Sequence, residues 1–198
     1  MTHRFENYLQ SGSSLRSGFA PGSFLIASPI LQSTPFERTV VFVLQDNEQG
    51  TFGVVVNRPA DDQLKSVWRE MTGLESDGRF MVHGGPIGGP VFALHQEKSL
   101  AELEMPGGIC VSADRKVFLQ LTRQQDSNYR IVFGVAGWQL GQLASEIKSG
   151  QWFQLNADPH HLFDDSADMW ENFLRQYGRQ VLESLIGSGR IPKSPWLN

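Results

Sequence analysis

The first third of the chain carries short, nearly continuous apolar runs that are separated by turn-forming clusters. Residues 39–44 and 52–56 are two such runs, and both are rich in β-branched side chains, which are typical of strands. The polar cluster 46–50 separates them, so the pattern predicts an antiparallel hairpin whose two strands are buried on both faces. Residues 24–27 predict an earlier strand, which ends before Pro29.

Apolar residues recur at helical spacing further along the chain. Between Asp61 and Gly73 they fall at positions i, i+3, i+4 and i+7, so this segment predicts an amphipathic helix. Asp61 is a suitable N-terminal cap for that helix, and Gly73 is suited to ending it. Comparable stripes predict helices capped by Ser112 and Ser166 and a third helix after Trp138. The remaining predicted strands are 79–83, 91–95, 108–111, 129–136 and 152–155.

Strand pairs joined by short turns dominate the first half, and strands and helices do not alternate strictly. This order favours an α+β fold with a largely antiparallel β-sheet over a doubly wound parallel sheet. We expect an N-terminal arm over residues 1–22, a single α+β domain over residues 23–187 and an irregular C-terminal tail over residues 188–198.

The octapeptide HGGPIGGP, which begins at His83, lies between two predicted strands. Its glycine spacing does not match the dinucleotide-binding fingerprint, and it lacks the Lys and Ser or Thr of a phosphate-binding P-loop. It looks like the HGGG oxyanion loop of α/β hydrolases, but the chain contains no G-x-S-x-G nucleophile elbow. We therefore interpret it as a connection between strands 79–83 and 91–95, in which glycine supplies backbone angles that other residues avoid. If these strands pair as a hairpin, His83 faces Val91 and lies roughly 13 Å from His95, too far to share one metal ion.

No spacing typical of metal ligands occurs among the histidines and the single cysteine. Adjacent His160 and His161 point about 100° apart on a helix and rarely chelate one ion together. Cys110 lies in an apolar strand-like run and is interpreted as a small buried hydrophobe. The candidate metal ligands are therefore His83, His95, Cys110, His160 and His161, and none of their spacings supports a shared ion. We expect neither a metal site nor a cofactor.

Composition narrows the classes of function further. The formal net charge is −4 and the pI is about 5.7, which argues against direct binding of nucleic acid or of an anionic membrane. One cysteine permits no intramolecular disulfide, and the N-terminal segment has no apolar run long enough for a signal peptide. No segment approaches the roughly 18 consecutive apolar residues of a membrane-spanning helix. These features predict a cytosolic protein.

Three segments carry a resemblance to a known family. They read FLIASPILQSTPFERTVVFVLQDNEQGTFGVVVNRP, VHGGPIGGPVFALH and GVAGWQLGQLASEIKSGQWF, in that order. Each resembles one signature of the YqgE/AlgH family, and the resemblance runs from about Gly22 to Tyr177. It implies a bacterial, cytosolic α+β protein whose β-sheet folds into a pseudo-barrel flanked by helices. It implies no established reaction, and one branch of the family carries the name of a transcriptional regulator of alginate synthesis.

The sequence departs from the family pattern just before the first hairpin turn. Many relatives have Cys-Glu-His-Asn where this chain has Leu44, Gln45, Asp46 and Asn47. Because the thiol and the imidazole are absent here, we do not expect a thiol or redox mechanism at this turn.

The leading hypothesis is a non-enzymatic binding or regulatory protein, because the family signatures are present and no complete catalytic set is. Asn, Gln and His side chains beside an aromatic ring can hold a small polar ligand, and a protein partner is the other candidate. The predicted surface lies beside the glycine loop and consists of Asn47, Asn57, Gly84, Gly85, His95, Trp138 and Gln142. The alternative is an enzyme of unknown class that uses His95 or His83 as a general base in a cleft beside the Gly84–Gly89 loop.

Overall fold

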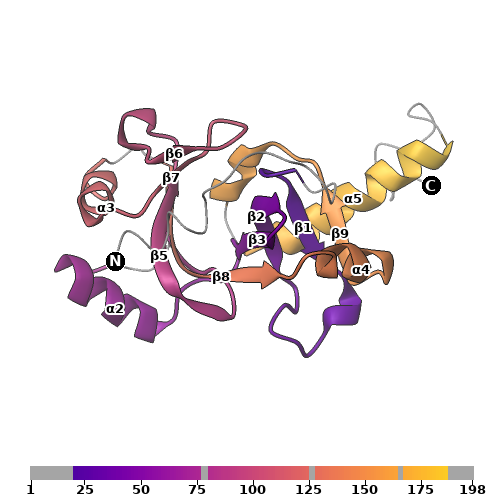
Figure 1. Cartoon of the computed structure of the whole chain (residues 1–198), viewed down its shortest axis with the longest axis horizontal. Helices are drawn as coiled ribbons and strands as arrows, with labels where there is room; N and C mark the ends of the chain where they lie inside the picture. The colour runs from indigo at the N-terminus through magenta and orange to yellow at the C-terminus, as the bar shows by residue number, and fades with distance from the viewer. Residues whose placement is uncertain (1–19, 77–79, 125–127, 165–166, 187–198) are drawn as a thin grey trace, which may run out of the picture.

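The computed structural model describes residues 20–76, 80–124, 128–164 and 167–186. The predicted N-terminal arm, the predicted C-terminal tail and the predicted cap Ser166 lie outside these residues, except for residues 20–22 of the arm. Within the described residues, a curled β-sheet packs against four α-helices (Figure 1).

The sheet contains nine strands in the described part of the chain. They are β1 (Phe24–Ala27), β2 (Val40–Asn47), β3 (Gly50–Val55), β4 (Met81–His83), β5 (Ile87–His95), β6 (Leu103–Glu104), β7 (Cys110–Ser112), β8 (Tyr129–Trp138) and β9 (Trp152–Leu155). Their order across the sheet is β6-β7-β5-β8-β3-β2-β1-β9, and β4 pairs with β8 off this path. All pairs are antiparallel except β4 with β8, which is parallel.

Strand β8 joins the two halves of the sheet. Its first part, residues 129–133, pairs with β5 on one side and, from residue 131, with β4 on the other. Its last part, residues 136–138, pairs with β3. The sheet curls around this strand into a half-barrel (Figure 1). The predicted α+β class with a largely antiparallel sheet folded into a pseudo-barrel is therefore confirmed.

Strands 79–83 and 91–95 do not pair as the hairpin considered from the sequence. Strands β4 and β5 lie on opposite sides of β8, so Phe133 of β8 pairs with both His83 and Val91 and separates them. The octapeptide therefore carries the chain from one side of β8 to the other. A short glycine-rich connection favours a hairpin on local grounds, but nothing in it signals that a later strand enters between its two arms.

The helices follow their sequence signals in part. The α-helices are α2 (Asp62–Thr72), α3 (Arg115–Leu121), α4 (Gln142–Lys148) and α5 (Met169–Ile186), and the 3-10 helices are η1 (Pro29–Leu31), η2 (Lys98–Leu100) and η3 (Pro159–Phe163). Helix α2 begins as predicted, because Asp61 accepts the backbone N–H of Leu64 at 2.9 Å, and it ends at Gly73 with a φ of 76°. Helix α3 differs from the prediction: its cap is Asp114, since the hydroxyl of Ser112 is bound to His95 and to the carbonyl of Leu100.

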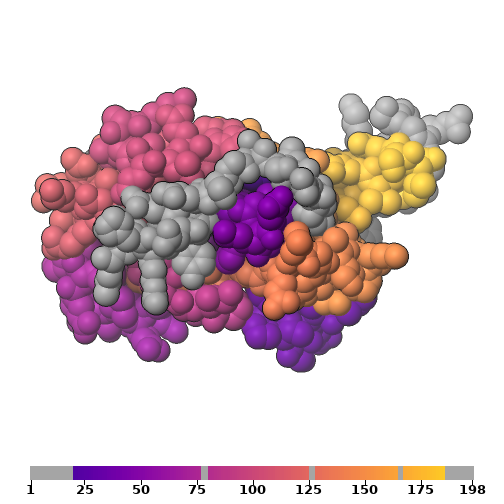
Figure 2. Space-filling model, viewed as in Figure 1, coloured from indigo at the N-terminus to yellow at the C-terminus, as the bar shows by residue number. Residues whose placement is uncertain are grey.

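Helix α5 packs on β1 and β9. The ring of Phe173 lies edge-on against Phe24 of β1, with 4.9 Å between the ring centroids. The indole N–H of Trp170 donates to the carbonyl of Ala27 at 2.8 Å. The C-terminal half of α5 projects from the body of the molecule (Figure 2). Among the described residues, none of the helices combines the length and the apolar character that a membrane span requires.

Candidate functional site

The predicted site residues do not meet on one surface. Tyr129 and Trp138 lie at opposite ends of strand β8, and His95 of β5 is the cross-strand partner of Tyr129. From position 129 to position 138, at about 3.3 Å per residue, the strand runs roughly 30 Å. The expectation that His95 converges with Trp138 is therefore wrong, and the predicted residues fall into separate places.

Trp138 and Gln142 meet at the carboxylate of Glu146 on α4. The indole N–H groups of Trp138 and Trp152 donate to Oε2 at 2.8 and 2.9 Å, and the Gln142 amide donates to Oε1 at 2.8 Å. The two indoles pack edge-on with ring centroids 5.6 Å apart, and the ring of Phe36 packs against both. Both indoles are almost fully buried and their N–H groups are satisfied, so this cluster holds α4 on the sheet.

The two predicted asparagines lie at opposite ends of the β2–β3 hairpin. Asn57 fixes the segment before β2, because its Oδ1 accepts the N–H of Val40 at 2.8 Å and its amide donates to the carbonyl of Arg38 at 2.9 Å. Asn47 ends β2, and its Oδ1 caps the turn that follows. The Nδ2 of Asn47 and both amide atoms of Gln45 are buried without a hydrogen-bond partner in the described structure. Asn57 therefore shapes a loop, whereas Asn47 retains an unused donor.

Gly84 and Gly85 allow the chain to cross β8. A Cβ on Gly84 would lie 2.3 Å from the carbonyl oxygen of Gly134, and one on Gly85 would lie 2.4 Å from the backbone carbonyl of Val135. Gly85 also has a φ of 151°, which residues other than glycine rarely adopt. The predicted role of the octapeptide as a strand connection is confirmed, and its glycines serve close backbone contact.

His95 is fully buried at the end of β5. Its Nδ1 accepts the backbone N–H of Glu97 at 3.2 Å, so its Nε2 carries the proton and donates to the hydroxyl of Ser112 at 3.0 Å. Ser112 in turn donates to the carbonyl of Leu100 at 2.6 Å. Burial lowers the pKa of His95 from its ordinary value of 6.5, which keeps the ring neutral. Because both ring nitrogens are engaged inside the protein, His95 is not placed to act as a general base in a cleft.

His83 and Cys110 are the other sequence candidates for chemistry. His83 is half-buried on β4, and its Nδ1 has no hydrogen-bond partner among the residues that the structure describes. Cys110 is buried, as predicted, and burial raises the pKa of its thiol. Across the described ranges, no three His, Cys, Asp or Glu side chains are grouped so that they could hold a metal ion.

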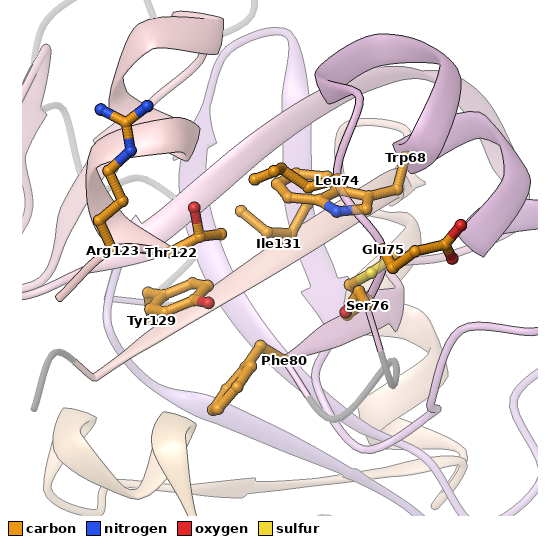
Figure 3. A pocket seen from close by; sticks show the side chains of 10 residues that line it. Trp68, Leu74, Glu75, Ser76, Phe80, Thr122, Arg123, Tyr129 and Ile131 are labelled. Atoms are coloured by element: carbon orange, nitrogen blue, oxygen red, sulfur yellow. The ribbon is translucent and has the colours of Figure 1, made fainter. Parts of the chain in front are cut away.

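A pocket that no sequence pattern indicated lies between α2, α3, β4 and β8 (Figure 3). Its volume is about 400 Å³. Arg115 of α3 donates to the carbonyls of Met71 and Thr72 at the end of α2, which joins the two helices beside the pocket. The lining residues are mainly apolar and are Trp68, Leu74, Glu75, Ser76, Phe80, Met81, Thr122, Arg123, Tyr129 and Ile131.

Trp68 is the most deeply buried aromatic side chain of the lining. It is 2% exposed, its ring packs against Phe118 with 6.1 Å between centroids, and its Nε1 has no partner among the described residues. In Figure 3 the indole nitrogen lies on the ring edge that faces the other lining side chains. Leu74 and Phe80 are 38% and 43% exposed, and Phe80 stacks on Tyr129 with 4.9 Å between centroids. The pocket thus combines exposed apolar walls with one buried donor that no described group uses.

The charged side chains of the pocket differ in their pairing. The Glu75 carboxylate accepts from Nε of Arg69 at 2.8 Å. The exposed guanidinium of Arg123 forms no ion pair with any described residue. Among the described residues, Arg69 and Glu75 therefore pair with each other, and the positive charge of Arg123 remains beside the pocket.

Residues 24–182 match a family model, DUF179, that is described as AlgH-like. The chain belongs to the AlgH-like family. The matched residues include all three signature segments, so the resemblance drawn from the sequence is confirmed.

Relatives of this AlgH-like protein match most of its length. A UPF0301 protein from Thermobifida fusca is 32% identical over 192 residues, which cover 89% of this chain and 94% of the relative. The UPF0301 protein IL2218 from Idiomarina loihiensis is 30% identical over 167 residues, which cover 79% of this chain and 90% of the relative. The solution structure of the AlgH protein from Pseudomonas aeruginosa has a TM-score of 0.66 at 27% identity and covers 92% of this chain and 100% of that one. The crystal structure of protein DIP2367 from Corynebacterium diphtheriae has a TM-score of 0.61 at 25% identity and covers 87% of this chain and 92% of that one.

In this AlgH-like protein the signature segments and the pocket are different parts of the chain. The signatures supply the glycine crossover and the indole groups that bind Glu146. All ten lining residues of the pocket lie outside the three signature segments. Trp68 is recognisable in the sequence only as one member of an apolar helical stripe, because a stripe predicts burial and says nothing about the partner of an indole N–H.

We expect His95 to make the stability of this AlgH-like protein depend on pH below about pH 6.5. Because burial lowers the pKa of the folded state, the unfolded chain takes up the proton first as the pH falls, and the folded state loses relative stability. Above that pH the ring is neutral in both states and contributes no pH dependence. The variant His95→Gln lacks this titration. The amount by which it is less stable than the wild type should therefore shrink as the pH falls below about 6.5, by at most about 1.4 kcal/mol per pH unit.

Denaturant unfolding of both proteins between about pH 7.5 and pH 5.5 measures this difference. A stability difference that stays constant over the whole range would contradict the assignment of a neutral, buried His95.

Proposed function

We propose that this AlgH-like protein is a non-enzymatic binding protein whose ligand site is the pocket between α2, α3, β4 and β8. The observation that carries the proposal is the indole N–H of Trp68, which is buried beside this pocket without a described partner. A buried donor without an acceptor costs about 1–3 kcal/mol. A ligand that presents an acceptor at this point would remove that cost.

The size and lining of the pocket support a small-molecule site. Such sites typically measure about 300–1,000 Å³ and are mainly apolar with a few polar groups that orient the ligand. The described lining contains no His or Cys, and the carboxylate of Glu75 is already paired with Arg69. These features favour binding over acid–base or nucleophilic chemistry at this place.

A regulatory role is a narrower form of the same proposal. The resemblance attaches the name of a transcriptional regulator to one branch of the family, and a pocket that is either filled or empty would give such a role a ligand-dependent signal. The net charge of −4 supports action through a protein partner over direct contact with nucleic acid. We assign the protein to the cytosol within this proposal, a location supported by its single, buried cysteine.

The variant Leu74→Glu is expected to lose small-molecule binding. Leu74 lines the pocket and is 38% exposed, so a carboxylate there disrupts the apolar wall at a position that the fold tolerates. A ligand-observed NMR screen of neutral aromatic fragments measures the effect. Fragments that bind the wild type should lose at least about tenfold in affinity, which corresponds to about 1.4 kcal/mol.

The matched control is Leu140→Glu. Leu140 is also an exposed leucine, at 63%, and it precedes α4 at the other end of β8, outside the lining of the pocket. This variant should bind the fragments as the wild type does. The proposal fails if no fragment binds the wild type, if binding survives Leu74→Glu, or if both variants lose it equally.

A further inference from the structure

The polar groups of the pocket define the chemical class of its ligand, an inference that rests on the proposed binding function. We infer that the pocket takes a small, planar aromatic molecule with one anionic group, such as a carboxylate or a sulfonate. The apolar walls, the buried donor of Trp68 and the guanidinium of Arg123, which has no ion partner among the described residues, each support one part of this assignment.

The walls suit a flat apolar body. Phe80 and Tyr129 stack with an interplanar angle of 29°, and Phe80 remains 43% exposed, so one aromatic surface is available at the mouth. Aromatic rings favour offset-stacked or edge-to-face contact with a further ring. A volume of about 400 Å³ lies near the lower end of the range for small-molecule sites, which favours a ligand of up to three aromatic rings over a peptide.

The Trp68 indole determines that the ligand carries an acceptor. An indole N–H is a donor and never an acceptor, so an amine or another donor on the ligand would leave it unsatisfied. Trp68 is 98% buried, since its exposed fraction is 2%, and the acceptor therefore has to enter the apolar part of the pocket. A carbonyl or ether oxygen meets this requirement without burying a charge, so the anionic group belongs at the exposed end of the ligand, toward the mouth of the pocket.

The pairing of charges at the mouth favours an anion over a cation. Glu75 is the carboxylate of the lining, and Arg69 already neutralises it at 2.8 Å. Arg123 has no described ion partner, and a guanidinium matches the geometry of carboxylate and sulfonate oxygens. Among the described lining residues, a cationic ligand would meet the positive charge of Arg123 and no carboxylate that lacks an ion partner.

Two fluorescent probes that differ in a single group test the inference on the full-length protein. The probe 1-anilinonaphthalene-8-sulfonate carries a sulfonate, and N-phenyl-1-naphthylamine has the same aromatic body without it. Fluorescence titration should give an affinity at least about tenfold higher for the anionic probe. Arg123→Gln should weaken the anionic probe by about threefold to tenfold and leave the neutral probe nearly unchanged.

Three further variants separate the pocket from other surfaces. Leu74→Glu should weaken both probes, whereas Leu182→Glu on the projecting half of α5 and Lys148→Gln on α4 should change neither. Arg123 is exposed, so its substitution leaves the fold intact. Equal affinities for the two probes that both depend on Leu74 would overturn the anionic class and leave the binding function standing. Probe binding that is absent, or that does not respond to Leu74→Glu, overturns the ligand class, and the fragment screen then decides on the binding function separately.

Discussion

Replacement of Glu146 with alanine is expected to lower the free energy of unfolding by about 2–6 kcal/mol. The reason is that two buried indole N–H groups, from Trp138 and Trp152, both donate to Oε2 of this carboxylate. Removing a shared acceptor leaves two buried donors unsatisfied, and each costs about 1–3 kcal/mol. Chemical denaturation followed by far-UV circular dichroism measures the loss.

The conservative variant Glu146→Gln should lose much less, about 1 kcal/mol, because an amide oxygen can still accept from the indoles. Gln142, which donates to the other carboxylate oxygen, is exposed and can turn to water. A second comparison uses the tryptophans themselves. Trp152→Phe removes a satisfied donor, whereas Trp68→Phe removes an unsatisfied one, so the first should be the more destabilising. Equal stability of Glu146→Ala and the wild type would show that the carboxylate does not hold the two indoles.

Gly85→Ala is expected to destabilise the protein by more than about 3 kcal/mol and to reduce the yield of folded protein sharply. A Cβ at this position would lie 2.4 Å from both the carbonyl carbon and the carbonyl oxygen of Val135 and 2.6 Å from the nitrogen of Ala136. These are backbone atoms of the central strand β8, which cannot move aside without breaking its pairing. The φ of 151° adds strain for any residue with a side chain. Thermal or denaturant unfolding measures the effect.

Two glycines of the same octapeptide provide the controls. A Cβ on Gly88 would meet no heavy atom within 4 Å, so Gly88→Ala should change the stability by no more than about 0.5 kcal/mol. Gly89 has equally open surroundings but a φ of 132°, so Gly89→Ala should cost about 1–3 kcal/mol through backbone strain alone. The test is that the loss of stability decreases in the order Gly85, Gly89, Gly88. Similar losses at all three positions would show that close contact with β8 is not what requires glycine at position 85.

The features that the sequence predicts well are those decided by local interactions. Helix α2 is one example, because its cap, its apolar stripe and its terminal glycine all lie within thirteen positions, 61–73. The β2–β3 hairpin is another, since its turn and its two apolar runs are adjacent. The α+β class follows from the same local patterns.

The features that the sequence does not predict depend on distant partners. Strand β8 separates β4 from β5, and no residue of the octapeptide carries that information. Ser112 has the chemistry of a helix cap, but His95 and Leu100 use its hydroxyl, so Asp114 caps α3 instead. The predicted site fails for a related reason: residues that share a family signature share packing roles and need not share a surface.

The position of β8 has a consequence for how the protein folds during synthesis. Strands β3, β4 and β5 are synthesised before residues 129–138, so the edges that β8 later occupies have no partner until then. Unpaired strand edges promote association between chains, and long-range strand pairing is slow. The nascent chain therefore remains vulnerable to aggregation until translation has passed β8, and the insertion of this one strand closes both halves of the sheet together.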